Sequence, residues 1–398
     1  MLGEQENGES TIDSLRAWGV AAGAFLSLFT VFGVVYSFGE FFGPMADEFG
    51  TNRSKTAMFF SITTFTYFVL GLATGRLADR VGQRKVLLMG SGAMVVGLFL
   101  TSKVSSLEMG YVTYGAGVGF GVACCFVPMV AGVGGWFERQ RTLALGVAVS
   151  GIGVGTLAVV PFSEWLIGEY GWRTAYQILA ALSAALLLLS AVLAHRPPTS
   201  GVAPEPLSKT VRGRSDFWIL YGSSFLLSGS LFMAFVFMAD FVSSESVDGS
   251  AAVLLGIIGI SSVVGRLLLG ILGARMPVQR LLLLSSVGLS ASFGVWATVG
   301  SSYLGLILFS ILLGISYGGI IAISPAVVAH LFGTLGMGGV LGALYTANGL
   351  GGLIGPPALG ALIDSSGYLF AQIIAGATAA IGALILLFLP KSAQSARS

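Results

Sequence analysis

Charged residues are scarce in this sequence. Only 10% of the 398 residues are Asp, Glu, Lys or Arg, whereas roughly a quarter of an ordinary soluble domain is charged. The formal net charge is +2, so there is no basic surplus for binding nucleic acid. Hydrophobic residues make up 55% of the chain. This balance argues against a soluble fold and predicts an all-α integral membrane protein.

Metal-ligating residues are scarce as well. The sequence has two cysteines, Cys124 and Cys125, which are adjacent within an apolar run, and two histidines, His195 and His330. Adjacent cysteines are poorly placed for a disulfide, and so few ligands do not make a metal site. We therefore expect buried free thiols, histidines at the membrane interface, and neither a metal nor a cofactor.

Long apolar runs dominate what is present. A hydrocarbon core about 30 Å thick requires about 20 apolar residues per helix, and the chain divides into twelve runs of about that length. The 58 glycines fit the same architecture, because small residues let membrane helices approach closely. The predicted spans are 17–42, 56–77, 85–103, 107–132, 141–166, 172–194, 217–240, 251–274, 280–299, 303–328, 337–362 and 367–390.

Residues 195–216 form the one long polar connection, which contains four prolines and four bases. It divides the chain into two predicted six-helix bundles, 1–194 and 217–398. With both termini and this linker in the cytoplasm, 15 of the 20 Lys and Arg residues are cytoplasmic and 4 are external, as the positive-inside rule requires. We expect a multi-pass protein of the plasma or inner membrane with both termini cytoplasmic.

The two predicted bundles resemble each other in sequence. Shifts of 196 and 197 residues superimpose glycines and prolines of the fourth and fifth spans on those of the tenth and eleventh, which indicates a parallel repeat. In transporters with such a repeat, the solute site lies between the halves near the membrane midplane. The matched positions are Gly117, Gly121 and Pro128 with Gly314, Gly318 and Pro325, and Gly146, Gly153, Gly155 and Pro161 with Gly342, Gly349, Gly351 and Pro357.

The loop after the second span reads GRLADRVGQRK, from Gly75 to Lys85. It resembles the signature loop of the major facilitator superfamily. Glycine there permits close helix approach, and an acid at a helix end beside several arginines can make charge-assisted contacts that latch the halves together. The residues expected in this gating motif are Gly75, Arg76, Asp79, Arg80 and Arg84.

A second segment, WFERQRTLALGVAVSGIGVG from Trp136 to Gly155, looks like the helix 5 motif of the monocarboxylate transporter family within that superfamily. The resemblance implies the major facilitator fold, with twelve helices in two pseudo-symmetric halves. It also implies secondary transport of a small organic anion.

Arg266 is the one base far from either end of a predicted span, about 12 Å from the cytoplasmic end of its helix. An arginine at that depth costs about 2.5–3.5 kcal/mol on insertion scales, so it usually faces a functional cavity. Its guanidinium matches a carboxylate geometrically. Small and polar residues recur around it, including Gly259, Ser262 and Gly270, and predict the cavity-facing stripe. Resemblance to the monocarboxylate transporters implies that Arg266 binds the substrate carboxylate.

Further polar side chains within the spans are candidates for the same site. Tyr114 and Tyr317 lie on the glycine-containing stripes of the fourth and tenth spans, from which each could offer a hydroxyl to the solute. Tyr345 and Asn348 lie on the eleventh span, and Ser262 lies one turn from Arg266. The predicted substrate-binding set is therefore Arg266, Tyr114, Tyr317, Asn348, Tyr345 and Ser262.

The residues that couple transport to protons in the family are not present at the matching positions of this sequence. Mammalian monocarboxylate transporters use a lysine on helix 1 and an aspartate one turn before the helix 8 arginine, where this chain has Glu40 and Ser262. An anion entering against about 100 mV meets about 2.3 kcal/mol of opposition, which a co-transported proton cancels. Glu40 and Asp240 are the candidate proton carriers.

These patterns predict a proton-coupled monocarboxylate symporter, with lactate or pyruvate as typical substrates, that works as a monomer by alternating access. Alternatives are an oxalate-type antiporter, an exporter of drugs or neutral solutes, and a receptor with the transporter fold. An enzyme is not expected, because the spans lack paired acids, a histidine cluster or a nucleophile with a base. The expected partners are the anion, protons and lipid.

Overall fold

A computed structural model describes residues 12–196, 213–273, 275–333 and 337–390. Within these ranges the regular structure is entirely helical. Most of the predicted linker, including Lys209 and Arg212, lies outside the described residues. The division of the chain at that linker therefore remains a prediction.

The N-terminal half contains helices with little polar sequence between them. In chain order they are α2 (Leu15–Tyr36), α3 (Phe38–Phe49), α4 (Arg53–Val81), α5 (Gln83–Thr101), α6 (Leu107–Gly110), the π-helix η1 (Tyr111–Val118), α7 (Gly119–Trp136) and α8 (Arg141–Leu193). The C-terminal half contains α10 (Ser215–Ser244), α11 (Ala251–Leu272), α12 (Val278–Val299), α13 (Tyr303–Phe332), α14 (Met337–Ile385) and the short 3-10 helix η2 (Leu386–Phe388).

Within the described residues, ten helical stretches are long and apolar enough to cross a membrane. Two of them are double. Gly171 (φ 75°) divides α8, and Gly367 (φ 80°) divides α14, at a backbone conformation that glycine adopts without steric cost. Counting each divided helix twice gives the twelve predicted membrane segments. The fold class is confirmed, and the two breaks are themselves 196 residues apart.

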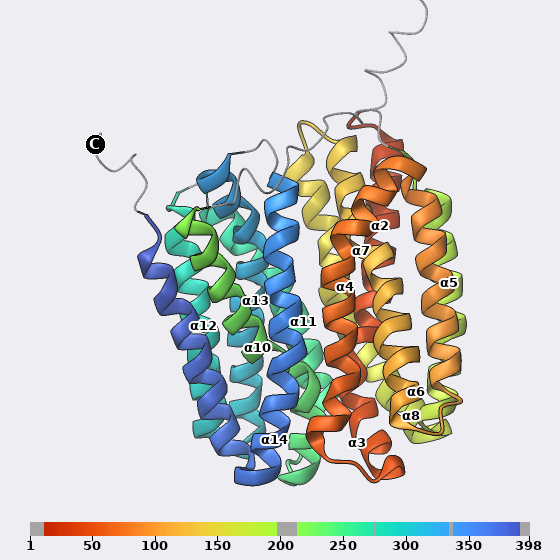
Figure 1. Ribbon diagram of the computed structural model, residues 1–398, viewed down its shortest axis with the longest axis vertical. Coiled ribbons are helices and arrows are strands. Elements are labelled where there is room, and N and C mark those ends of the chain that lie inside the picture. Colours follow the sequence, from red (N-terminus) through yellow and green to blue (C-terminus); the bar gives the residue numbers. More distant parts are fainter. Residues whose placement is uncertain (1–11, 197–212, 274, 334–336, 391–398) are drawn as a thin grey trace, which may run out of the picture.

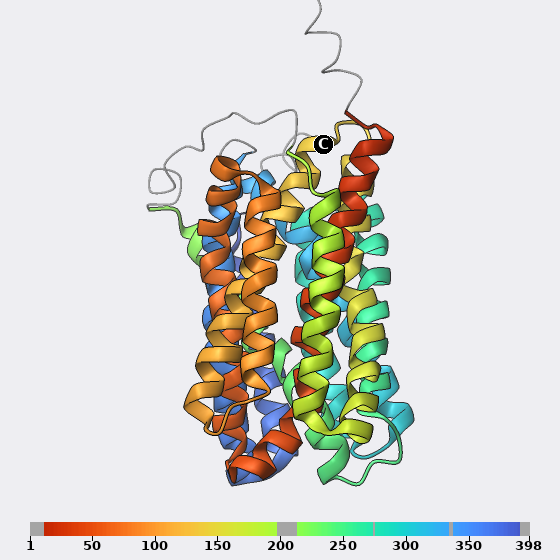
Figure 2. The ribbon, with the colours of Figure 1, turned by 90° about the vertical axis from the view of Figure 1, so that its right-hand side faces the viewer.

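The helices form two bundles that lie side by side in Figure 1, one coloured red to yellow-green and the other green to blue, and in Figure 2 the first bundle lies in front of the second. Several packing pairs in one bundle have a counterpart in the other. Thus α2 packs on α8 as α10 packs on α14, and α4 packs on α7 as α11 packs on α13. The bundles meet along two equivalent seams, α4 with α14 and α8 with α11, and α3 adds a contact with α10.

Close glycine contacts reproduce the repeat in atomic detail. A Cβ added to Gly155 would lie 2.3 Å from the carbonyl oxygen of Phe29, and one added to Gly351 would lie 2.3 Å from that of Phe225. Both the glycines and their partners are separated by 196 residues, so the same helix crossing occurs in both halves. Small residues allow such crossings because they bring backbones into contact.

The first membrane segment differs from its predicted extent of 17–42. It is interrupted at Ser37, after which α3 continues to Phe49. Gly39 follows the break, where an added Cβ would lie 2.7 Å from the carbonyl oxygen of Phe235 on α10. This close approach to the opposite half requires glycine. Glu40 is the next residue and therefore lies beside the interruption.

The outer surface of the bundles is apolar. Phe99 on α5, Leu308 on α13 and Phe370 on α14 are each about half exposed. Large exposed apolar side chains in quantity mark a surface that does not face water. Such a surface is suited to contact with lipid tails, as a multi-pass membrane protein requires.

Candidate functional site

A cavity of about 1050 Å³ lies between the two halves. It is lined from both sides, by α2, α4, α7 and α8 of one half and by α10, α11, α13 and α14 of the other. It extends to the end of the molecule at which α8, α10 and α14 begin, which we call the cavity end (top of Figure 1). Its polar lining residues are Tyr36, Tyr67, Thr142, Ser150, Ser223, Ser224, Ser228, Arg266, Tyr317, Ser324, Tyr345 and Asn348.

Arg266 is the single ionisable side chain other than tyrosine among the described residues that line this cavity. It is 8% exposed, and its Nη1 donates a 2.7 Å hydrogen bond to the carbonyl oxygen of Val149 on α8. Its Nε and Nη2 are buried and have no hydrogen-bond partner among the described residues. A buried cation without a carboxylate costs free energy. The site is therefore complementary to an anion.

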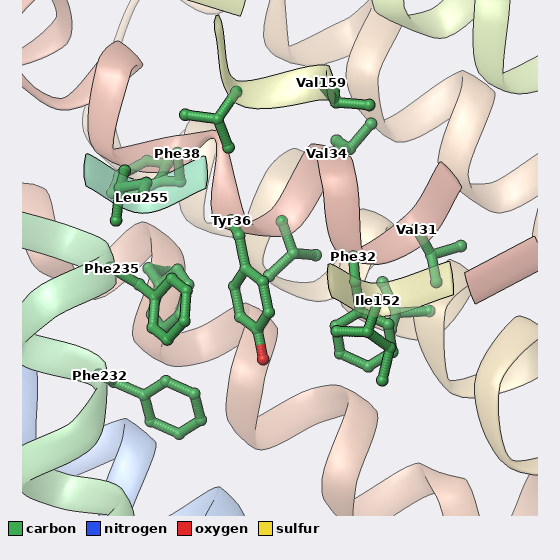
Figure 3. Close-up of a cluster of buried hydrophobic side chains, with 14 of the residues drawn as sticks. Val31, Phe32, Val34, Tyr36, Phe38, Ile152, Val159, Phe232, Phe235 and Leu255 are labelled. Atoms are coloured by element: carbon green, nitrogen blue, oxygen red, sulfur yellow. The ribbon is translucent and has the colours of Figure 1, made fainter. Parts of the chain in front are cut away.

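Two tyrosine hydroxyls join the halves beside this arginine. Tyr36 of α2 and Tyr317 of α13 share a 2.8 Å hydrogen bond, and the guanidinium carbon of Arg266 lies 5.9 Å from the centre of the Tyr317 ring. The Tyr36 ring stacks on Phe235 of α10 at 4.1 Å. Figure 3 shows Tyr36 between Phe235 on one side and Phe32 on the other. The pair closes the cavity on the side away from the cavity end.

The structure places three of the other predicted binding residues at the cavity, namely Tyr317, Tyr345 and Asn348. It places the remaining two elsewhere. Tyr114 is fully buried within the N-terminal half, where its hydroxyl donates to the carbonyl oxygen of Val34 at 3.4 Å. Ser262 is also buried, and its hydroxyl donates to Gly259 at 2.7 Å.

The cavity-facing stripe of α11 differs from the expected one. Gly259 packs against α8, where a Cβ added to it would lie 2.6 Å from the carbonyl oxygen of Gly153. The carbonyl of Ser262 would be 2.0 Å from a Cβ added to Gly318 on α13. The small residues before Arg266 thus serve helix packing. The α11 residues that line the cavity are Val263, Arg266, Leu267, Gly270 and Ile271.

Tyr36 and Tyr67 were not expected at the site. Both are buried, both line the cavity, and the Tyr67 hydroxyl has no hydrogen-bond partner among the described residues. Each is the single tyrosine of its predicted span. A single tyrosine in an otherwise apolar span is the signal that could have identified them, because a buried tyrosine hydroxyl usually has a hydrogen-bond partner.

The opposite end of the molecule is held closed by charged groups, and we call it the sealed end. Arg53 at the start of α4 contacts Asp240 of α10 at 2.5 Å and Asp364 of α14 at 3.2 Å. The Tyr368 hydroxyl also donates to Asp240. Asp240, one of the two candidate proton carriers, is therefore part of an ion-pair network that joins the halves. It does not line the cavity.

Glu40, the other candidate, lies on α3 between the cavity and the sealed end. Its Oε1 is buried and has no hydrogen-bond partner among the described residues. Glu164 of α8 is the charged side chain that acts on it electrostatically. Both oxygens of Glu164 accept hydrogen bonds, at 3.1 and 3.0 Å, from the Ser250 hydroxyl that caps α11. Glu40 is thus a partly buried carboxyl group beside the contact between α8 and α11.

The predicted gating motif lies at the cavity end of α4 and the start of α5. A Cβ added to Gly75 would lie 3.3 Å from Val127 of α7. The backbone carbonyl of Asp79 accepts a 2.9 Å hydrogen bond from Arg196. In the described part of the chain, no ion pair involves Asp79, Arg76, Arg80 or Arg84. The latch function of this motif remains a prediction.

Metal ligands do not gather anywhere in the described ranges. No group of three or more His, Cys, Asp or Glu side chains is placed so that it could hold a metal ion there. Cys124 and Cys125 are buried free thiols, as expected from their position.

Comparison with known proteins identifies the superfamily that shares this architecture. The sequence model of the Major Facilitator Superfamily matches residues 23–302 and 249–398. Similar proteins include the MFS-type transporter pynF of Aspergillus niger, 30% identical over 88% of this chain and 82% of that protein. They also include monocarboxylate transporter 12-B of Danio rerio, 27% identical over 93% and 86%, and monocarboxylate transporter 13 of Rattus norvegicus, 29% identical over 94% and 89%.

The fold is also that of a solved transporter. The crystal structure of a variant of the nucleoside transporter NupG superimposes with a TM-score of 0.77, at 16% identity, over 94% of this chain and all of that one. At such identity the likeness concerns the fold alone. The matched relatives are transporters and not enzymes, and they confirm the predicted resemblance to monocarboxylate transporters. The chain belongs to the Major Facilitator Superfamily.

Proposed function

We propose that this protein carries a small organic monocarboxylate across the membrane by alternating access, with Arg266 binding the carboxylate. The observation that supports this most directly is the guanidinium with two unpartnered N–H groups at a cavity between the halves. Arginine presents such groups as a planar fork that matches a carboxylate. In a water-poor cavity this charge-assisted pair is stronger than at a surface.

A site with one cation favours a substrate with one carboxylate over a substrate with two. An oxalate-type exchanger would need a further base to hold its second charge, and no other Lys, Arg or His is among the described lining residues. A carrier of neutral solutes would have no use for a buried charge that costs free energy. The names of the relatives, monocarboxylate transporters 12-B and 13, support the same solute class.

The conformation is consistent with one end point of a transport cycle. If the termini are cytoplasmic, as the charge distribution predicts, the cavity end faces the cytoplasm and the sealed end faces outward. The halves would then rock about the site, opening the Arg53 network while the cavity end closes. Exchange between two such states is how carriers with repeated halves operate.

Glu40 is our proposed proton carrier. Its buried carboxyl oxygen lacks a partner, whereas Asp240 is already paired with Arg53. A carboxylate that is buried without a partner costs free energy unless it binds a proton or a cation. Proton binding at Glu40 would offset the charge of the anion during uptake.

Uptake of radiolabelled lactate and pyruvate into proteoliposomes, with and without an inward proton gradient, tests both assignments. We expect Arg266→Ala to reduce uptake at least about 30-fold, since truncating one partner of a buried charged pair costs about 2–5 kcal/mol. Arg280→Ala, at an exposed position on α12, is the matched control. Glu40→Gln should retain counterflow of the anion but lose stimulation by the proton gradient.

Full transport by Arg266→Ala would remove Arg266 from the site and favour a carrier of neutral solutes. Undiminished proton stimulation in Glu40→Gln would remove Glu40 from the coupling mechanism and leave anion transport standing. Oxalate exchange without a proton effect would favour the antiporter.

A further inference from the structure

We propose that the preferred substrate is an aryl or arylalkyl monocarboxylate without an ammonium group, and not a three-carbon acid or an aromatic amino acid. This inference rests on the proposed function, because it assumes that Arg266 holds the carboxylate. It concerns the rest of the solute. The evidence is the composition of the remaining cavity wall.

Five aromatic rings form one continuous wall on the N-terminal side of the cavity and its seam with α14. Consecutive ring centres are 5.1, 5.9, 4.4 and 5.8 Å apart. All five residues line the cavity. We call this set the aromatic wall; in order, it comprises Phe126, Phe32, Tyr67, Phe68 and Tyr345.

The arrangement separates two kinds of recognition. Arg266 and Tyr317 belong to the C-terminal half, on α11 and α13, whereas four of the five rings belong to α2, α4 and α7 of the other half. Aromatic pairs prefer offset or edge-to-face contacts with ring centres 4.5–7 Å apart. A solute whose carboxylate meets Arg266 could place a ring against this wall, and both halves would then hold it.

The charges that line the cavity exclude a zwitterion. Among the described residues no Asp or Glu faces it, so an α-ammonium group would enter without a counter-charge. It would also lie near the Arg266 cation. Burying an unpaired charge is strongly unfavourable. The site therefore selects an acid that lacks the amino group.

The Tyr67 hydroxyl offers one further contact on the aromatic wall. It is fully buried at the cavity and has no partner among the described residues. A buried polar group without a partner destabilises the protein unless a ligand satisfies it. A ring bearing a hydroxyl or carbonyl group could supply that hydrogen bond.

The size of the cavity agrees with a larger solute. A volume of about 1050 Å³ is at the upper end of the range, about 300–1,000 Å³, of pockets that hold drug-sized ligands. A three-carbon acid would fill a small part of this space and leave the aromatic wall in contact with water. An acid with a ring would displace that water from apolar surface, which is favourable.

Uptake of radiolabelled phenylacetate, 4-hydroxyphenylacetate, phenylalanine and lactate into proteoliposomes containing the full chain tests the inference. We expect kcat/KM for phenylacetate to exceed that for lactate by about tenfold or more, the scale at which pockets discriminate apolar groups. Phenylalanine should neither be taken up nor compete. 4-Hydroxyphenylacetate should be favoured over phenylacetate in wild type and lose that advantage in Tyr67→Phe.

Phe68→Leu tests the wall itself. It should raise the KM for phenylacetate about tenfold and leave lactate kinetics within about twofold. Phe99→Leu, on the lipid-facing surface of α5, is the matched control and should change neither. A variant that merely folds poorly would lose lactate uptake as well, so the ratio of the two substrates isolates the wall.

Lactate uptake that depends on Arg266, with no uptake of or inhibition by phenylacetate, would overturn the inference and leave the proposed function intact. Uptake of phenylalanine equal to that of phenylacetate would overturn the exclusion of the ammonium group. Absence of uptake of every organic acid would overturn both proposals together.

Discussion

The two ends of the cleft between the halves are built from different chemistry. At the cavity end, the halves are separated by a space in which Arg266 is the single charged side chain among the described lining residues. At the sealed end they are joined by Arg53, Asp240 and Asp364. The same helix pairs, α4 with α14 and α8 with α11, make the main contacts between the halves.

The difference indicates which contacts persist and which must break during transport. The α8–α11 seam includes a close backbone contact between Gly153 and Gly259, which the side chains of Val263 and Thr156 flank. Two glycines in contact suit a pivot because no side chain separates the two backbones at that point. The sealed end depends on ion pairs with partners 17–29% exposed. Such pairs are weak enough to break and re-form.

Disrupting the pivot should have the largest effect. In Gly259→Leu a side chain would enter a space where even a Cβ lies 2.6 Å from Gly153, and overpacking of this kind costs about 1–3 kcal/mol. We expect loss of transport in proteoliposomes and a lower melting temperature. Gly92→Leu, where a Cβ meets nothing within 4 Å, is the control. Normal transport by Gly259→Leu would show that the halves do not turn at this contact.

Removing the charge at the sealed end should have an intermediate effect. Arg53→Gln breaks both ion pairs, and we expect the equilibrium to shift toward opening of this end by about 1–1.5 kcal/mol, or roughly tenfold. Labelling of a Phe237→Cys reporter, a site that is fully buried, by a membrane-impermeant maleimide measures the shift. Lys55→Gln, at an exposed base two residues away, should not change the labelling rate. An unchanged rate in Arg53→Gln would assign the seal to packing alone.

Removing the hydroxyl bridge between the halves should have a smaller effect. Tyr36→Phe deletes the 2.8 Å hydrogen bond to Tyr317 and retains the stacking on Phe235. A hydrogen bond contributes about 0.5–1.5 kcal/mol net, so the same reporter should label about two- to twelvefold faster, with a central value of about fivefold. Slower labelling would mean that the bridge favours opening of the sealed end.

The weakest expected effect concerns the seam between α8 and α11. Glu164→Gln keeps one acceptor for the Ser250 hydroxyl and removes an exposed charge, which contributes less than about 1 kcal/mol. Labelling should change by less than about twofold. A larger change would place a second electrostatic seal between α8 and α11.

The sequence predicts the number of membrane segments and the depth of Arg266 because hydrophobic length and the cost of a buried charge are local properties. The repeat predicts equivalent glycines, and the contacts of Gly155 and Gly351 bear this out. The rotation of a helix about its own axis is not a local property, because it is set by the helices that pack against it. Ser262 and Tyr114 face other helices because the packing partners α13 and α8 determine which side of a helix meets the cavity. The place of Tyr36 and Tyr67 at the cavity depends on the same helix rotations.

The buried arginine has an electrical consequence. Among the described residues, Arg266 is the one cation at the cavity, so the cavity is neutral when it holds a monoanion and carries one positive charge when it does not. When Glu40 releases its proton with the anion, as proposed, its carboxylate balances Arg266 in the unloaded carrier. A charge that moves through the field of a membrane at 100 mV gains or loses about 2.3 kcal/mol. Lactate transport by the wild type should therefore move no net charge, whereas in Glu40→Gln the unloaded carrier is positive, and rapid voltage steps should produce transient currents that saturating substrate suppresses.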